Sequence, residues 1–125
     1  MIGTANTFSS FAVDDVERAR EFYADTLGLK VSDGPMGVLS LDVADGRSIL
    51  VYPKPDFTPA TYTVLNFQVD DVDAAVDELS GRGVKFERYE GFDQDAKGIS
   101  RTAGAPSIAW FKDPAGNILA VLKPE

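Results

Sequence analysis

An internal repeat constrains this chain more than any other feature of its sequence. The run Phe11-Ala-Val-Asp-Asp-Val16 returns as Phe67-Gln-Val-Asp-Asp-Val72. The likeness continues downstream, where Gly28-Leu-Lys-Val31 corresponds to Gly83-Val-Lys-Phe86, one residue out of register. Such self-similarity indicates one supersecondary unit used twice. We expect a single domain, 1–125, made of two modules of one plan, about 1–53 and about 61–125, joined by a proline-rich linker.

Each module is predicted to begin with a strand and then a helix. Residues 8–13 carry apolar side chains of both parities, which is typical of a strand with two covered faces. Apolar residues then recur at helical spacing, first as Val16, Ala19, Tyr23 and Leu27, and in the second module as Val72, Ala75, Val76 and Leu79.

Acidic pairs stand where both predicted helices begin. Asp14 and Asp70 are predicted to cap the free N–H groups there, and Gly28 and Gly83 to end the helices in the left-handed conformation. Paired carboxylates can also mark a catalytic site. Because the pair occurs in both modules, capping and the helix dipole explain it better.

Three strand-like runs follow each helix, at 30–33, 38–43 and 48–52 and again at 84–90, 106–112 and 117–123. Asp45-Gly46 and Ala115-Gly116 supply turns between them. The segment 91–106 is the longest irregular stretch, and we expect it to be a mobile flap. The pattern predicts an α+β protein with a βαβββ order in each module.

Composition excludes several classes of function. The chain has no histidine and no cysteine, so imidazole and thiolate are absent as metal ligands, general bases and nucleophiles. A formal charge of −8 disfavours nucleic acid as a partner. No apolar stretch approaches the ~20 residues that cross a bilayer, and no basic segment precedes an apolar one near Met1. We expect a cytoplasmic protein without a membrane partner.

Two segments resemble a known superfamily. The run from Phe11 to Leu29, with its Phe22-Tyr23 and Leu27-Gly28, and the run Trp110-Phe-Lys-Asp-Pro-Ala-Gly-Asn-Ile-Leu119 resemble the vicinal-oxygen-chelate superfamily. That superfamily includes glyoxalase I, extradiol dioxygenases, and fosfomycin- and bleomycin-resistance proteins. The resemblance spans essentially the whole chain. It implies the glyoxalase/bleomycin-resistance fold, in which two tandem βαβββ modules form a cup-shaped mixed sheet.

The resemblance also implies where a metal would be bound in metal-dependent relatives. Their four ligand positions fall here on Phe8, Leu50, Val64 and Ala120. A divalent ion needs imidazole, thiolate or carboxylate lone pairs at about 2.0 to 2.3 Å, and hydrocarbon side chains offer none. We expect no metal and no other cofactor. The stretch Asp93 to Gly98 begins like a calcium loop, but Lys97 replaces an oxygen ligand.

Strand alternation extends this set to the lining of the cup. If Phe8 and Val64 face the cup, Ser10, Asn66 and Gln68 face it too. In related resistance proteins an aromatic residue before the late turn lines the cup, which corresponds to Trp110. Of the other aromatic residues we select Tyr52 and Phe92 as part of the site. Tyr62 and Tyr89 could equally line the cup or its flap or serve as ordinary packing. The predicted ligand-binding residues are Phe8, Ser10, Leu50, Tyr52, Val64, Asn66, Gln68, Phe92, Trp110 and Ala120.

The leading hypothesis is a metal-independent protein that binds a small hydrophobic, aromatic or cationic natural product, as bleomycin-resistance proteins do, without catalytic residues. Trp110 and Tyr52 would stack on the ligand. One alternative is a metal-free isomerase or lyase that uses Asp42, Tyr52 or Lys112 as acid or base. Another is a structural or regulatory module whose cup is filled by side chains, although buried Ser10, Asn66 and Gln68 would then lack evident partners.

The resemblance suggests a homodimer as well, because many relatives of this size complete their cups with modules from two chains. Phe57, Tyr62 and the linker would then lie near the interface.

Overall fold

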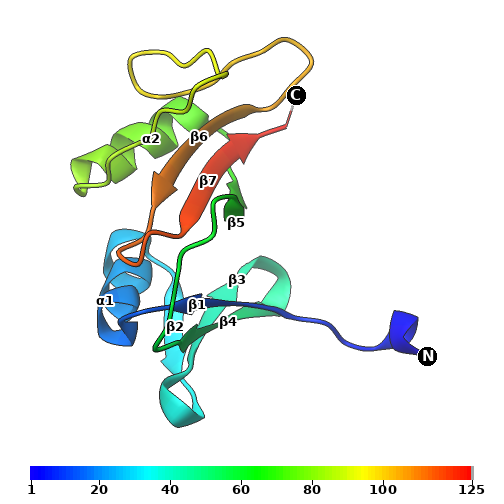
Figure 1. Ribbon diagram of the computed structural model, residues 1–125. Helices are drawn as coiled ribbons and strands as arrows, with labels where there is room; N and C mark the ends of the chain where they lie inside the picture. The colour runs from blue at the N-terminus through cyan, green and yellow to red at the C-terminus, as the bar shows by residue number, and fades with distance from the viewer. Residues whose placement is uncertain (125) are drawn as a thin grey trace. The chain divides into compact units, whose positions relative to one another are not determined.

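Two separate sheets carry the fold. In the computed structural model, which describes residues 1–124, the chain divides into unit 1, Met1–Thr58, and unit 2, which begins at Pro59 (Figure 1). The division falls inside the proline-rich segment 53–60. The prediction of an α+β protein is confirmed.

Unit 1 contains a four-stranded mixed sheet. Its elements are β1 (Ser9–Val13), α1 (Val16–Glu21), a π-helical turn (Phe22–Thr26), β2 (Lys30–Asp33), β3 (Leu39–Val43) and β4 (Arg47–Pro53), with short 3-10 turns at Ile2–Thr4, Pro35–Gly37 and Ala44–Gly46. The strand order is β1-β4-β3-β2, with β1 and β4 parallel and the other pairs antiparallel. The predicted Asp45-Gly46 turn is confirmed, since both residues have positive φ, as a tight hairpin turn requires.

Unit 2 repeats this plan with one strand fewer. Its elements are β5 (Thr63–Gln68), α2 (Val72–Gly81), β6 (Ser107–Lys112) and β7 (Ile118–Lys123). The order is β5-β7-β6, with β5 and β7 parallel. As in unit 1, the last strand returns beside the first. The predicted Gly83 cap is confirmed: Gly83 has positive φ, and the Val84 N–H donates to the Leu79 carbonyl over 3.0 Å.

The strand predicted at 84–90 is wrong. Only Phe86 pairs with Phe111, and the Glu87 N–H donates to the Trp110 carbonyl over 2.8 Å. The next position on the β6 edge belongs to Ser100, which exchanges two backbone hydrogen bonds with Ile108. Because β6 has one free edge, the pairing of Ser100 displaces the chain after Glu87 from the sheet.

The segment 91–106 is therefore anchored to unit 2 and does not hang free along its whole length. Ile99 and Ser100 are buried at the β6 edge. The side-chain amide of Gln94 accepts from the Tyr89 N–H and donates to the carbonyls of Glu87 and Gly98, all within 2.9 Å. One amide thus replaces part of the missing strand ladder, while residues 91–93, 95–97 and 101–104 of the segment are exposed.

The helix caps lie one residue later than predicted. Asp15, and not Asp14, accepts from the N–H groups of Glu17 and Arg18, at 3.1 and 3.2 Å. In α2 the Asp71 carboxylate accepts from the Ala74 N–H over 3.0 Å. Both helices begin at a valine, which places the second acid of each pair at the N-cap. The acidic pairs are structural in this respect.

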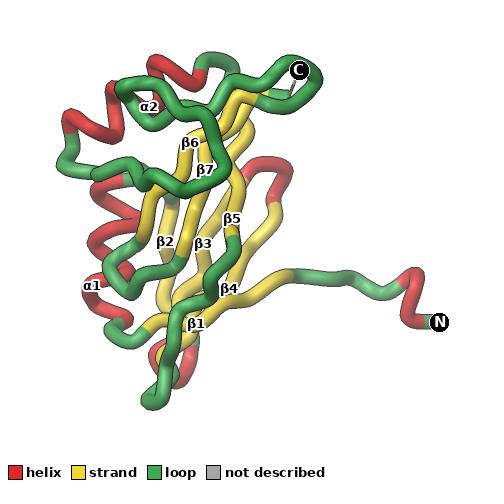
Figure 2. The backbone as a smooth tube through the Cα atoms, turned by 45° about the horizontal axis from the view of Figure 1, so that its top comes forward, coloured by secondary structure: helices red, strands yellow, loops and turns green. Residues whose placement is uncertain are grey.

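Each sheet packs one face against its own helix. In unit 1 the rings of Phe11 and Tyr23 lie 5.9 Å apart, so the face of Phe11, Leu41 and Val51 is the helix side. In unit 2 the rings of Phe86 and Phe111 lie 5.5 Å apart, and Phe86 lines a hollow with Val76 of α2. Figure 2 shows α2 lying beside β6 and β7. Side chains alternate along a strand, so Trp110 and Ala120 lie on the other face.

We predict that Asp71→Ala lowers the free energy of unfolding by about 1 kcal/mol, since it leaves a helix N–H without its acceptor. Asp70→Ala is the matched control, because it removes the same charge beside the same helix but no cap. Urea unfolding followed by circular dichroism measures both. Equal losses for the two variants would show that the effect is charge and not capping.

Candidate functional site

The second face of the unit 1 sheet, away from α1, carries several of the predicted site residues. Leu50 lies between Ser10 on β1 and Ser40 on β3, in register with both. Tyr52 is the neighbour of Ala12 and is 39% exposed. Leu50 is half-buried and Ser10 is exposed. This face therefore combines hydroxyls with the apolar side chains of Ala12 and Leu50 and the aromatic ring of Tyr52.

Phe8 lies outside this arrangement. It precedes β1, and its side chain is 70% exposed. The prediction placed it in the first strand, but pairing with β4 begins at Ser9. Ser10, two residues after Phe8, is the β1 residue that lies opposite Leu50. Phe8 itself is therefore not beside Leu50 in the sheet.

An aromatic cluster dominates the second face of the unit 2 sheet, away from α2. Asn66, Ala120 and Trp110 form one row across β5, β7 and β6. Trp110 is 8% exposed and packs with Ile118 and Ala120, and Ile108 and Tyr89 lie against them. Gln68 continues this face beside Leu122, and both Asn66 and Gln68 are exposed. Val64 lies at a register shift in β5 and is half-buried.

Two rings from one turn pack on Trp110. The ring centroid of Phe92 lies 4.7 Å from that of Trp110, and the ring of Tyr89 stands edge-on to it at 5.5 Å. Phe92 was predicted to line the site and is 52% exposed. Tyr89 was left open by the sequence and belongs to the cluster. The available signal was the spacing Tyr-Glu-Gly-Phe, because a glycine at the third position suits a tight turn that brings its ends together.

The turn has the geometry that this spacing indicates. The Phe92 N–H donates to the Tyr89 carbonyl over 3.4 Å, and Gly91 has a φ of 88°. A β-carbon at Gly91 would be strained by that φ alone. Burial raises the pKa of the Tyr89 phenol above its ordinary value, and the Glu87 carboxylate adds to the rise. The phenol is therefore protonated at neutral pH.

In the loop that follows the turn, residues 93–99, the Asp95 carboxylate is hydrogen-bonded by backbone N–H groups of the same loop. Asp95 accepts from the N–H groups of Lys97 and Ile99, at 2.9 and 3.0 Å. The Ile99 N–H is the main reason why the pKa of Asp95 lies below its ordinary value. Gly98 has positive φ, and a β-carbon there would meet that of Phe86 at 3.3 Å. The loop is therefore a closed turn held by the Asp95 carboxylate.

Leu50 and Ala120 are two of the positions at which the resemblance implies metal ligands, and the residues there do not fit a metal. Leu50 and Ala120 present hydrocarbon, and their neighbours in register, Ser10 and Asn66, present one hydroxyl and one amide. Neutral oxygens of this kind are weak ligands without a carboxylate or imidazole beside them. Within residues 1–124 no three acidic side chains gather closely enough to hold an ion.

The three candidate acids and bases lie in different settings. Asp42 is half-buried in unit 1, where Ser48 donates to it at 3.5 Å. Tyr52 lies on the same face of that sheet, four residues from Ser48 along β4. Lys112, in unit 2, forms an ion pair with Glu87 over 3.4 Å. The structure therefore places Lys112 beside the aromatic cluster with its charge already paired.

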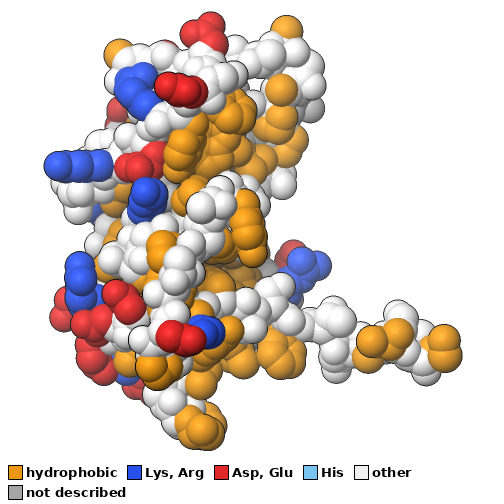
Figure 3. Space-filling view, in the orientation of Figure 1, with side chains coloured by type: hydrophobic (Ala, Val, Ile, Leu, Met, Phe, Trp, Pro, Cys, Tyr) orange, Lys and Arg blue, Asp and Glu red, His pale blue; other side chains and the backbone are white. Residues whose placement is uncertain are grey.

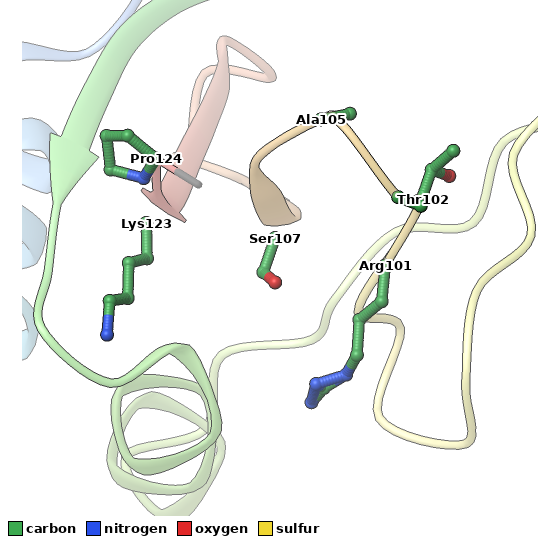
Figure 4. A pocket seen from close by; sticks show the side chains of 7 residues that line it. Arg101, Thr102, Ala105, Ser107, Lys123 and Pro124 are labelled. Carbon is green, nitrogen blue, oxygen red and sulfur yellow. The ribbon is translucent and has the colours of Figure 1, made fainter.

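A hollow of about 440 Å³ lies elsewhere in unit 2, at the far end of the β6–β7 hairpin. It is lined by Arg101, Thr102, Ala103, Ala105, Ser107, Lys123 and Pro124 (Figure 4). The hollow has two cationic side chains, Arg101 and Lys123. Arg101 forms an ion pair with Asp73 of α2 over 2.7 Å, so its charge is neutralised. None of the predicted site residues contributes to this hollow.

No helix among the described residues has the length and apolar character needed to cross a membrane.

Comparisons with known proteins agree with this fold. The family model of the Glyoxalase/Bleomycin resistance protein/Dioxygenase superfamily matches residues 5–121. The uncharacterised protein YraH of Bacillus subtilis is 27% identical, over 89% of this chain and 91% of its own length. TnmS3, an antibiotic binding protein from Streptomyces sp. CB03234, is 25% identical over 98% of both chains, with a TM-score of 0.71.

The fosfomycin resistance protein FosX of Listeria monocytogenes shares the fold, with a TM-score of 0.74 at 14% identity over 98% of this chain and 94% of its own. A match of the family model over nearly the whole chain, together with two sheets whose last strand returns beside the first, leads to one assignment. This chain belongs to the Glyoxalase/Bleomycin resistance protein/Dioxygenase superfamily.

Proposed function

We propose that this protein binds a small hydrophobic, aromatic molecule without a metal ion, and sequesters it. The observation that carries the proposal is the cluster of Trp110, Tyr89 and Phe92 on a sheet face that the helix of its unit does not cover. Ligand pockets are built from such rings with a few polar groups for orientation. Here Asn66 and Gln68 are the exposed amides on that face.

A planar ligand fits the aromatic cluster for a physical reason. Phe92 is half-exposed while Trp110 beneath it is nearly buried. A flat molecule that slides between the two rings exchanges one aromatic contact for two, and it covers apolar surface that water now reaches. Each such contact contributes roughly 0.5 to 1.5 kcal/mol beyond the area it buries.

Two further observations support binding over metal chemistry. Hydrocarbon stands at positions where the resemblance implies ligands in metal-dependent relatives, at Leu50 on β4 and at Ala120 on β7. TnmS3, which is 25% identical over nearly the full length, is an antibiotic binding protein. We therefore place an antibiotic-like natural product among the candidate ligands, and assign no catalytic residue.

Charge favours a neutral or cationic ligand over an anion. The formal charge is −8, and acidic side chains gather around α1 in unit 1 (Figure 3). The same view shows hydrophobic side chains over β6 and β7 of unit 2. An acidic surface raises the local concentration of cations, and the face of a tryptophan ring attracts them at contact.

We extend the proposal to the second face of unit 1, where Leu50 and Tyr52 lie beside Ser10. Whether a ligand touches that face is tested separately from the aromatic cluster, by the Tyr52→Ala variant.

The cytoplasmic location predicted from the sequence stays a prediction.

Trp110 is the only tryptophan, so its fluorescence reports on the site directly. Titration with a panel of flat aromatic and cationic antibiotics is expected to give a saturable change for at least one compound. Phe92→Ala keeps the reporter and should weaken that affinity roughly threefold to tenfold, since one stacking contact is lost. Ile2→Ala, which shortens an exposed apolar side chain of the N-terminal tail, is the control and should change nothing. A flat response to the whole panel would contradict the proposal.

Metal independence is tested on the protein as purified. Elemental analysis is expected to find no transition metal in stoichiometric amount, and a chelator should leave the affinity for the ligand unchanged, because no strong donor occupies the ligand positions. Zinc, nickel, iron or manganese retained at one ion per chain, with binding lost on chelation, would count against it.

We also propose that the protein is a homodimer, with exposed Tyr62 and half-buried Phe57 near the interface. Sedimentation velocity at micromolar concentration should give twice the mass of one chain, and Tyr62→Ala should shift the equilibrium toward monomer. A monomer at all concentrations would rule this out.

A further inference from the structure

One polar atom inside the aromatic cluster has no partner. Within residues 1–124 the Tyr89 hydroxyl oxygen is almost fully buried and has no hydrogen-bond partner. Leaving such a group unpaired costs roughly 1 to 3 kcal/mol, and folded proteins keep few of them. This unpaired hydroxyl lies in the cluster to which we assign the ligand.

The position of Tyr89 is set by its backbone. The Gln94 side chain accepts from the Tyr89 N–H over 2.8 Å, and the Tyr89 carbonyl accepts from Phe92 to close the turn. The ring then stands edge-on to Trp110. These contacts hold the phenol in place before any ligand arrives, which reduces the entropy that binding must overcome.

The Glu87 carboxylate does not accept a hydrogen bond from the phenol. Glu87, whose carboxylate contributes to the raised pKa of Tyr89, is paired with Lys112 over 3.4 Å. The remaining neighbours in the cluster are Trp110, Ile118, Ala120 and Ile108, which offer no acceptor on their side chains. A neutral phenol is a better donor than acceptor because its oxygen lone pair is delocalised into the ring. What the site lacks is therefore an acceptor.

We propose that the Tyr89 hydroxyl selects aromatic ligands that carry a hydrogen-bond acceptor, such as a carbonyl oxygen, on the edge of the ring. The inference rests on the proposed function and narrows its ligand class. The ligand lies between Phe92 and Trp110, with Phe92 moving outward on the Gly91 turn, and its carbonyl accepts from the Tyr89 O–H. The protein discriminates against the corresponding hydrocarbon because that molecule leaves the hydroxyl unpaired.

Two compounds of nearly equal shape test this proposal: an acetylnaphthalene, which has a carbonyl, and the isopropylnaphthalene of the same substitution pattern, which has none. Equilibrium dialysis measures both affinities in the wild type and in Tyr89→Phe. The wild type should prefer the ketone roughly threefold to tenfold, the range expected for one hydrogen bond. Tyr89→Phe should remove that preference and leave the affinity for the hydrocarbon unchanged within about twofold.

A second measurement guards against a folding defect. Because Tyr89→Phe deletes only an unpaired hydroxyl, the urea midpoint of the variant should equal or exceed that of the wild type. A lowered midpoint would show that the hydroxyl is paired in solution and would overturn the premise. Equal affinity of the wild type for ketone and hydrocarbon, or a preference that survives in Tyr89→Phe, would overturn the inference alone. Failure of the wild type to bind either compound would contradict the proposed function as well.

Discussion

A strand has two faces, and in each unit of this protein one short helix covers only one of them. In unit 2 the side of Phe111 packs with Phe86 and α2. The side of Trp110 receives cover from the turn that begins at Tyr89 and ends at Phe92. Large apolar side chains on an uncovered face need either a partner or a ligand. The candidate site and the proposed function both follow from this asymmetry.

Competition for the free edge of β6 decides how that cover is made. Glu87 takes one position on the edge and Ser100 takes the next, so the chain between them leaves the sheet. The Gln94 amide then satisfies backbone groups that a regular strand would have paired. Had residues 84–90 formed the predicted strand, the ladder would have continued past Glu87 along β6. The lost strand is the structural origin of the aromatic cluster.

Much of the fold was accessible from sequence because it is local. The repeat, the helical spacing of Val72 and Val76, and the Asp45-Gly46 turn each predict structure within a few residues. Errors appeared where two neighbouring residues suit the same structural role equally well by their local sequence. Asp14 and Asp15 are both good caps, and the start of α1 at Val16 selects the second. Phe8 continues the apolar pattern of β1, but pairing with β4 ends before it.

The sequence by itself determined that no imidazole or thiolate exists, that hydrocarbon stands at Leu50 and Ala120, and that side chains alternate between two faces. These properties depend on residue identity and on the period of a strand. Only the tertiary structure decided that Tyr89 joins Trp110 and that its hydroxyl is left without a partner. Hydrogen-bond satisfaction depends on which distant segments, such as Gln94 and Ser100, meet at one edge, and no local pattern encodes that meeting.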